Sequence, residues 1–237
     1  MTQLIARAND FTPEELTRLT STISAPRLGR YVRTCRDNVS TALKLYQWNL
    51  EISAAFFLPP QMLEVTVRNA VAEAIEAAYG PNWTHSRSFM FSLSAPRKAF
   101  NARQHLMSIA VRHTVPSKVI ADLNFIFWQK MLVRSLDSPL WNPHLCTVFP
   151  NMEKCKTTQQ LRTGLHDGLE TLRTLRNRIA HHEPIFERDL HYDLHLIDTL
   201  IGYRCQHTVN WMRRIEQVSA LLARHPLVPA MPQARPA

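Results

Sequence analysis

Glycine is scarce in this chain, with 5 residues among 237. So low a content is unusual for a protein that needs many β-turns and bulges. The 15 prolines fall mostly between segments of helical periodicity, where proline commonly begins or ends a helix. The sequence shows neither an internal repeat nor a β-hairpin signal. We therefore expect an all-α fold, a bundle of several long helices.

Paired cysteines and long apolar runs are also missing. The four cysteines are widely spaced, and none belongs to a C-x-x-C pair: Cys35, Cys146, Cys155 and Cys205. This pattern argues against a zinc ribbon or a redox motif and suits a reducing cytosol. No apolar run reaches the roughly 18 residues of a membrane span. Asp10 and Glu14 stand where a signal peptide needs an apolar core. We expect a cytoplasmic protein without membrane attachment.

The motifs of several common enzyme classes are absent. The chain contains no G-x-x-x-x-G-K-[ST], G-x-G-x-x-G or G-x-S-x-G, which disfavours P-loop, dinucleotide and serine-hydrolase chemistry. His191 and His195 have the spacing of a zinc-binding pair. They lack the glutamate of a metalloprotease motif and a clear third ligand. We expect them to be exposed or partly buried helix residues, and we expect no metal and no cofactor.

The formal charge of +9 and the pI of about 9.8 are the strongest features of the composition. Such a field attracts polyanions, of which nucleic acid is the first candidate, although many basic proteins bind none. A helix expected to begin at residues 94–96 carries a run of cations: Arg97, Lys98, Arg103 and Arg112. This run is either a solvated face or a set of phosphate contacts.

Helical periodicity extends over most of the chain. We expect helices over 12–23, 28–58, 61–79, 96–112, 116–132, 158–182 and 188–224, with a loop at 80–95 and an irregular connection at 136–156. Residues 1–224 are expected to form one domain, and residues 225–237 a disordered, proline-rich tail. Phe127 and Trp128 alternate with aliphatic residues, which favours a place in the core over a base-stacking role.

The end of the helix predicted from residue 158 concentrates chemically active side chains. Leu161, Leu165, Leu169, Leu172 and Leu175 form its apolar stripe. The segment L-R-N-R-I-A-H-H-E-P-I-F, residues 175–186, follows and is stopped by a proline. Arginine offers a permanently charged fork that suits phosphate, and histidine transfers protons near neutral pH. As ordinary surface residues, the same cations would simply oppose the helix dipole.

Within this segment Asn177 and His181 lie four residues apart on one helix face, and Arg176 lies about 100° round from Asn177. The sequence R-N-x-x-A-H-H fits the R-x4-6-H motif of the HEPN superfamily. It resembles more closely the motif of the bacterial abortive-infection (Abi-like, AbiD/AbiF-type) proteins. Three further blocks resemble that family: L-Y-x-W-N with L-E-V-x-x-R-N (residues 45–49 and 63–69), G-P-N-W (80–83) and V-I-A-D-L-N-F-I-F-W (119–128).

The resemblance implies an α-helical protein, often dimeric, and in many members a ribonuclease. It assigns Arg176 to phosphate, Asn177 to orientation of the substrate and His181 to proton transfer. His182 also fits the variable spacing, and Arg178 is a further candidate phosphate contact. Glu64, Arg68 and Asn69 match one of these family blocks, and the resemblance defines no role for them. Glu64 and Arg68 also have the spacing of a helix-stabilising ion pair.

These features predict a metal-independent endoribonuclease that acts through the 2′-hydroxyl of RNA, in phage defence or as a toxin. Expected partners are RNA, a second copy of the chain, and a neutralising antitoxin or a phage-derived trigger. The alternative is a non-catalytic helical module that binds RNA or a protein. A third hypothesis, a metal-dependent nuclease, differs in predicting that a chelator abolishes cleavage.

Overall fold

The structure is a computed structural model, and it describes residues 11–96 and 98–227. Within those ranges the regular elements are all helices, which confirms the all-α prediction. No helix in the same ranges combines the length and the apolar character that crossing a membrane requires. The fold divides into two compact units, residues 1–55 with 217–237 and residues 56–216. The sequence patterns, from which we expected one domain over 1–224, do not reveal this division.

The first unit contains the helices that precede residue 56 and one short helix from the end of the chain: α1 (Pro13–Ile23), α2 (Ala25–Thr34), α3 (Val39–Ala55) and α13 (Val218–Leu222). Thr12 and Glu15 form a capping box at the start of α1, where the helix was predicted to begin. The continuous helix predicted from residue 28 is wrong, because Arg36 and Asp37 adopt positive φ angles of 51° and 63° and separate α2 from α3.

The end of the described chain packs on α3. The Trp48 indole Nε1 donates a hydrogen bond of 2.9 Å to the carbonyl oxygen of Leu221. The imidazole of His225 lies edge-on to the same indole, with ring centroids 4.3 Å apart. His225 therefore has a defined place, although we expected it in the disordered tail. Residues 228–237 of that tail lie outside the described residues.

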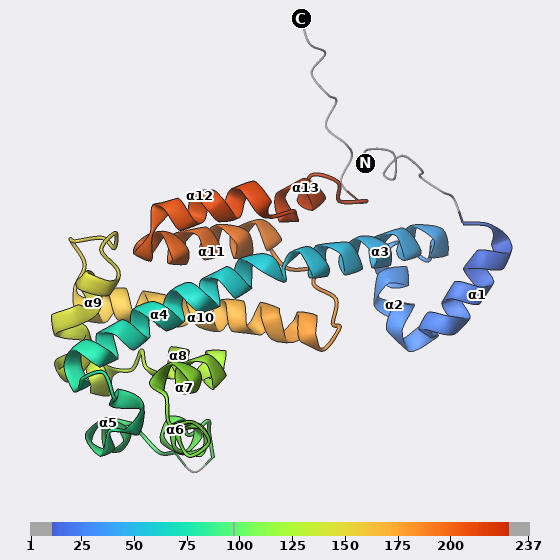
Figure 1. Cartoon of the computed structure of the whole chain (residues 1–237). Coiled ribbons are helices and arrows are strands. Elements are labelled where there is room, and N and C mark those ends of the chain that lie inside the picture. The colour runs from blue at the N-terminus through green and yellow to red at the C-terminus, as the bar shows by residue number, and fades with distance from the viewer. Residues whose placement is uncertain (1–10, 97, 228–237) are drawn as a thin grey trace, which may run out of the picture. The chain divides into compact units, whose positions relative to one another are not determined.

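The second unit contains the two longest helices and four shorter ones that frame it (Figure 1): α4 (Leu58–Tyr79), α10 (Thr158–Ala180), α8 (Phe125–Lys130), α9 (Asn142–Val148), α11 (Leu190–Arg204) and α12 (Gln206–Ile215). Helix α11 packs against α4, α10 and α12, and α10 also contacts α8. The predicted leucine stripe of α10 is buried, which confirms it. Phe127 and Trp128 are fully buried, as expected.

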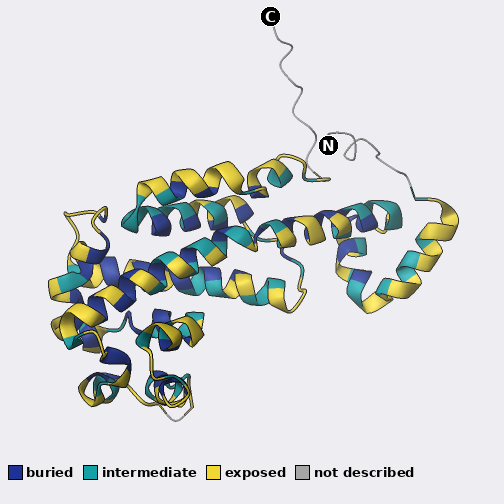
Figure 2. Ribbon diagram, viewed as in Figure 1, coloured by how far each residue is buried: buried dark blue, intermediate teal, exposed yellow. Residues whose placement is uncertain are grey.

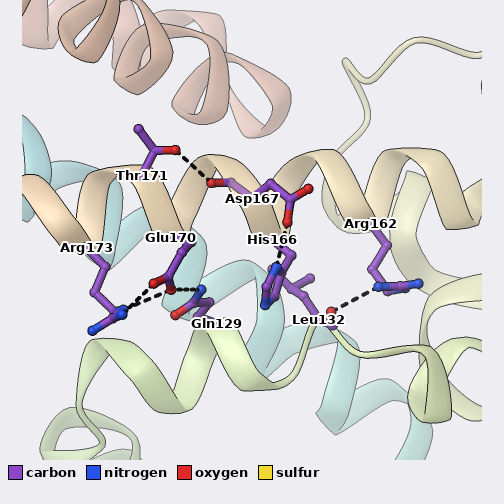
Figure 3. A network of polar contacts seen from close by, with 8 residues as sticks. All are labelled: Gln129, Leu132, Arg162, His166, Asp167, Glu170, Thr171 and Arg173. Carbon is purple, nitrogen blue, oxygen red and sulfur yellow. Dashed lines mark hydrogen bonds and ion pairs between the residues drawn. The ribbon is translucent and has the colours of Figure 1, made fainter. Parts of the chain in front are cut away.

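Polar contacts fix α10 against α8 (Figure 3). The buried Gln129 donates a hydrogen bond to the carboxylate of Glu170, which also accepts from Arg173 at 3.0 Å. The hydrogen bond from Arg173, against the opposing effect of desolvation, lowers the pKa of Glu170 to about 2. Nearer the start of α10, the buried Arg162 donates to the carbonyl oxygen of Leu132 at 3.1 Å. These contacts set the rotation of α10 about its axis.

Between α4 and α8 the chain forms short helices: η1 (Trp83–His85), α5 (Arg87–Ser92), α6 (Ala102–Ala110) and α7 (Pro116–Asp122). The prediction of a loop over 80–95 was therefore wrong, since η1 and α5 lie within it. The next helix begins at Ala102 rather than near Pro96, because Asn101 supplies the N-cap and accepts a 2.9 Å bond from the amide of Gln104. Lys98 and Arg112 consequently flank α6 instead of lying on it.

Three further expectations needed correction. The segment 116–132 is divided at Leu123, whose extended backbone separates α7 from α8. Residues 136–156 are not wholly irregular, since they contain a π-helical turn, η3 (Asp137–Trp141), and α9. A short turn, η2 (Arg134–Leu136), precedes them. The helix predicted over 188–224 is three helices, broken by extended backbone at Cys205 and Glu216.

Candidate functional site at the end of α10

The C-terminal end of α10 is closed by a Schellman motif. The amide of Glu183 donates to the carbonyl oxygen of Arg178 at 2.8 Å, and the amide of His182 donates to that of Ile179 at 3.0 Å. Glycine usually occupies the left-handed position of this motif, but here it is His182, with a φ of 56°. A non-glycine residue held in this conformation stores strain, and such residues occur preferentially at functional sites.

Arg178 holds the turn that follows α10. Its guanidinium donates a hydrogen bond to the carbonyl oxygen of Pro184 and lies 3.4 Å, from Nε to Oε2, from the carboxylate of Glu183. Through these two contacts the Arg178 side chain fixes the turn. The structure thus gives Arg178 a local role besides the phosphate contact that its position in the motif suggested.

Arg176 lies on the last turns of α10 and His181 is its C-cap residue, and both are exposed; residues 176–181 are all exposed or intermediate, the classes that Figure 2 draws in yellow and teal. Their backbones are separated by about 7.5 Å along the helix axis, given the rise of an α-helix. Among the described residues neither side chain makes a hydrogen bond or an ion pair, so both are free to meet a ligand. Asn177 lies between them and is half-buried. The motif therefore presents one guanidinium and one imidazole at the same open helix end.

Helix α4 brings a carboxylate and a second guanidinium toward this end. Glu64 is half-buried, and burial raises the pKa of its carboxyl group, while the positive charges of Arg176 and Arg68 act in the opposite direction. Glu64 is thus electrically coupled to the first arginine of the motif, although the two lie more than a hundred residues apart in sequence. The structure brings Glu64, Arg68 and Arg176 into one charged cluster.

The cluster contains an unsatisfied donor. The Nε atom of Arg68 is enclosed and has no hydrogen-bond partner in the part of the chain that the structure describes. Glu64 and Arg68 have the spacing of an ion pair, yet no contact within 4.0 Å joins their charged groups. A buried donor without a partner is costly unless a ligand satisfies it. The cluster has two arginines for one carboxylate and is suited to an anion.

Asn69 does not join the cluster. It is exposed on α4 and lies about 140° round the helix from Glu64. His191 and His195 are exposed on α11, as expected. Neither belongs to a group of three or more histidine, cysteine, aspartate or glutamate side chains able to hold a metal ion within the described ranges.

Sequence reasoning missed a clamp just beyond the motif. Arg188 donates two hydrogen bonds to the carboxylate of Asp193, from Nε at 2.9 Å and from Nη2 at 2.7 Å. Asp193 is 1% exposed, so the carboxylate of this bidentate pair is almost fully removed from water, whereas the Arg188 side chain is partly exposed. It ties the loop after α10 to the first turn of α11. The charge and spacing of the two residues were visible in the sequence, but their burial was not.

No family model, curated protein or solved structure matches this chain. The likeness to the Abi-like and HEPN proteins accordingly rests on the motifs of the sequence itself, and its consequences for function are proposals.

Proposed function

We propose that this protein is a metal-independent endoribonuclease of the Abi-like HEPN type, acting in phage defence or in toxin-mediated growth arrest. The observation that carries the proposal is the exposed pair Arg176 and His181 at one helix end, next to the Glu64–Arg68 cluster. A phosphodiester bound there would meet a fixed positive charge and a group that transfers protons near neutral pH.

In the proposed reaction, neutral His181 removes the proton of a ribose 2′-hydroxyl. The 2′-oxygen forms a bond to the adjacent phosphorus, and the bond from phosphorus to the 5′-oxygen of the next nucleotide breaks. Arg176 stabilises the negative charge that accumulates on the phosphorane. Protonated His181 of a second copy of the chain supplies the proton to the leaving 5′-oxygen. The products are a 2′,3′-cyclic phosphate and a 5′-hydroxyl.

Glu64 acts as a positioning residue in this scheme. Its half-buried negative charge attracts the guanidinium groups of Arg176 and Arg68, both of which lower the pKa of Glu64. Because burial raises the pKa of Glu64, its ionised form costs stability as pH rises through that pKa. Glu64→Gln is therefore expected to stabilise the protein at neutral pH while it lowers the cleavage rate.

The proposal is tested by expressing wild type, Arg176→Ala and His181→Ala at equal levels in growing cells. Wild type should arrest growth and fragment RNA, and both variants should do neither. Arg214→Ala and His207→Ala are matched controls, since both residues are exposed on α12 of the same unit. They should behave as wild type.

The alternative, a helical module that binds RNA or a protein without cutting, predicts a different outcome. All variants would then bind RNA alike, and none would yield 2′,3′-cyclic ends. A variant that cannot dimerise, yet stays folded and fully active, would refute the pairing of two His181 side chains.

A further inference from the structure

One long stretch of the second unit contains no acidic residue. The chain has 19 aspartates and glutamates, yet residues 77–121, here called the acid-free segment, contain none. The same segment carries six cations: Arg87, Arg97, Lys98, Arg103, Arg112 and Lys118. Helices η1, α5, α6 and α7 of the segment pack on one another around the buried Trp83 (Figure 1). The cations of these helices and their flanks therefore belong to one compact part of the unit, except Arg97, which lies outside the described residues.

Four of these cations are exposed and unpaired. Arg87, Lys98, Arg112 and Lys118 all face solvent, and in the described ranges none of them makes a hydrogen bond or an ion pair. Glu76 and Asp122 border the segment in sequence, and Asp122, at the end of α7, accepts a hydrogen bond of 2.6 Å from His113. Cations elsewhere in the unit are commonly paired, as Arg188 and Arg173 are. Asp122 also acts electrostatically on Arg112, and apart from this the positive charge of the acid-free segment has no acidic partner among the described residues.

An aromatic ring is held in a fixed place beside these charges. Phe91, on α5, is 68% exposed, and the Arg103 guanidinium lies 5.2 Å from its ring centroid. Arg103 cannot swing away easily, because its guanidinium donates to the carbonyl oxygens of Met90, Phe91 and Leu93. Ring and guanidinium together form a preorganised stacking platform.

A shallow apolar pocket adjoins this platform. Met107 and Val111, both exposed on or just after α6, line it together with Arg103. Apolar surface next to a stacking platform suits the face of a base or a ribose. The platform, the pocket and the unpaired cations combine the two elements that single-stranded nucleic acids require: stacking surface and positive charge.

We propose that the acid-free segment is a binding surface for single-stranded RNA, separate from the cleavage site at the end of α10. A base stacks at Phe91 and Arg103, and Lys98, Arg112 and Lys118 contact phosphates. A protein interface generally uses charges of both signs at its rim, whereas a polyphosphate chain carries one sign only and is repelled by every acid in its path. The absence of acids from residues 77–121 favours the polyphosphate, and the adjoining Asp122 is engaged by His113. The choice of RNA over DNA rests on the proposed function.

The test measures binding of a fluorescently labelled 20-nucleotide oligouridylate by anisotropy, with all proteins carrying His181→Ala so that no cleavage occurs. One variant adds Lys98→Glu, Arg112→Glu and Lys118→Glu. Its matched control adds Arg134→Glu, Lys154→Glu and Arg214→Glu, which reverse three exposed cations elsewhere in the same unit. A third variant adds Phe91→Ala. Circular dichroism and thermal melting establish that each variant is folded.

The proposal predicts that the first variant binds more weakly than the control. Its slope of log K against log salt should fall by about 2, or about 0.7 for each phosphate that the protein no longer neutralises. Phe91→Ala should weaken binding roughly tenfold, because one base then no longer stacks. Equal weakening in the variant and its control would overturn the proposal, because only overall charge would then matter.

Two further outcomes would also overturn the proposal. In the first, RNA binding is unchanged in all variants. In the second, the protein binds anionic phospholipid vesicles, and the same substitutions abolish vesicle binding while RNA binding persists. The cleavage assay of the proposed function is separate. If the oligonucleotide binds as predicted but wild type cuts no RNA, the proposed function fails and the surface stands. If wild type cuts RNA while all variants bind alike, the surface fails and the function stands.

Discussion

His182 allows a test of both the turn and the chemistry at the end of α10. It occupies the left-handed position of the Schellman motif, whereas His181, one residue earlier, has a right-handed φ of −91°. The two histidines are both exposed and differ mainly in backbone conformation. Replacing each with glycine and with valine separates the backbone requirement of the position from the function of its side chain.

The expected magnitudes follow from that difference. Glycine at position 182 relieves about 1 kcal/mol of left-handed strain and loses about 0.5–1 kcal/mol through the greater freedom of the unfolded chain. His182→Gly should therefore be near neutral. His182→Val places a β-branched residue at positive φ and should be less stable by about 1–2 kcal/mol. At position 181 the order should reverse, with glycine the less stable by about 0.5–1 kcal/mol.

Thermal melting measures this difference, because 1 kcal/mol corresponds to about 2–4 °C in a domain of this size. The same four proteins are then assayed for RNA cleavage. We expect His182→Gly to retain activity and both position-181 variants to lose it. If valine and glycine are equally tolerated at 182, the left-handed turn is wrong. If His182→Gly is folded and inactive, His182 rather than His181 transfers the proton.

Three further predictions concern the scaffold. Gly164 and Gly168 both lie in α10. Gly164→Ala has open space around the new Cβ and should raise the free energy of unfolding by about 1 kcal/mol, whereas the new Cβ of Gly168→Ala would lie 3.1 Å from a leucine of α11. Denaturant unfolding should therefore show Gly168→Ala to be less stable than Gly164→Ala by about 1–2 kcal/mol. Asp193→Ala leaves the Arg188 guanidinium unpaired and should cost about 3 kcal/mol in the same experiment, and an unchanged midpoint would contradict the clamp. Glu170 has a pKa lowered to about 2, so its ion pair stabilises above the unfolded pKa of 4.5 and is lost as pH falls toward 2. Because its side chain is 43% exposed, Glu170→Gln should cost only about 1 kcal/mol at pH 7, and the deficit should shrink between pH 5 and pH 2. A deficit that is constant with pH would contradict this assignment.

The parts of the fold that follow from local pattern could be predicted from the sequence. The leucine stripe of α10 and the Thr12 capping box depend on spacing within one helix, and both are present. The break between α2 and α3 has a local signal that we did not use: Asp37 and Asn38 are turn-favouring residues, and the Asn38 side chain accepts a hydrogen bond from the amide of Thr41 in α3. The helix break at Leu123 is marked by Asn124, whose side chain caps α8, whereas no side-chain cap marks the break at Cys205.

The candidate site, like the fold, could be predicted from the sequence only where it depends on local pattern. The motif of α10 was found in the sequence because its arginine and histidine lie close together there. The coupling of Glu64 to Arg176 depends on the packing of α4 and α10 on the shared helices α8, α9 and α11, which no local pattern encodes. The matching block suggested that Glu64 matters but gave it no role. The occupation of Arg178 in the turn likewise depends on the path of residues 183–184 after the helix.

The claim that the end of α10 cleaves RNA through the 2′-hydroxyl has one direct test. The substrate is a DNA oligonucleotide that contains a single ribonucleotide, and the reaction is run with an excess of chelator. Wild type should cut only on the 3′ side of that ribose and leave a 2′,3′-cyclic phosphate, and Arg176→Ala and His181→Ala should not cut. Cleavage of the 2′-O-methyl form of the same oligonucleotide, or cleavage that chelator abolishes, would contradict the account.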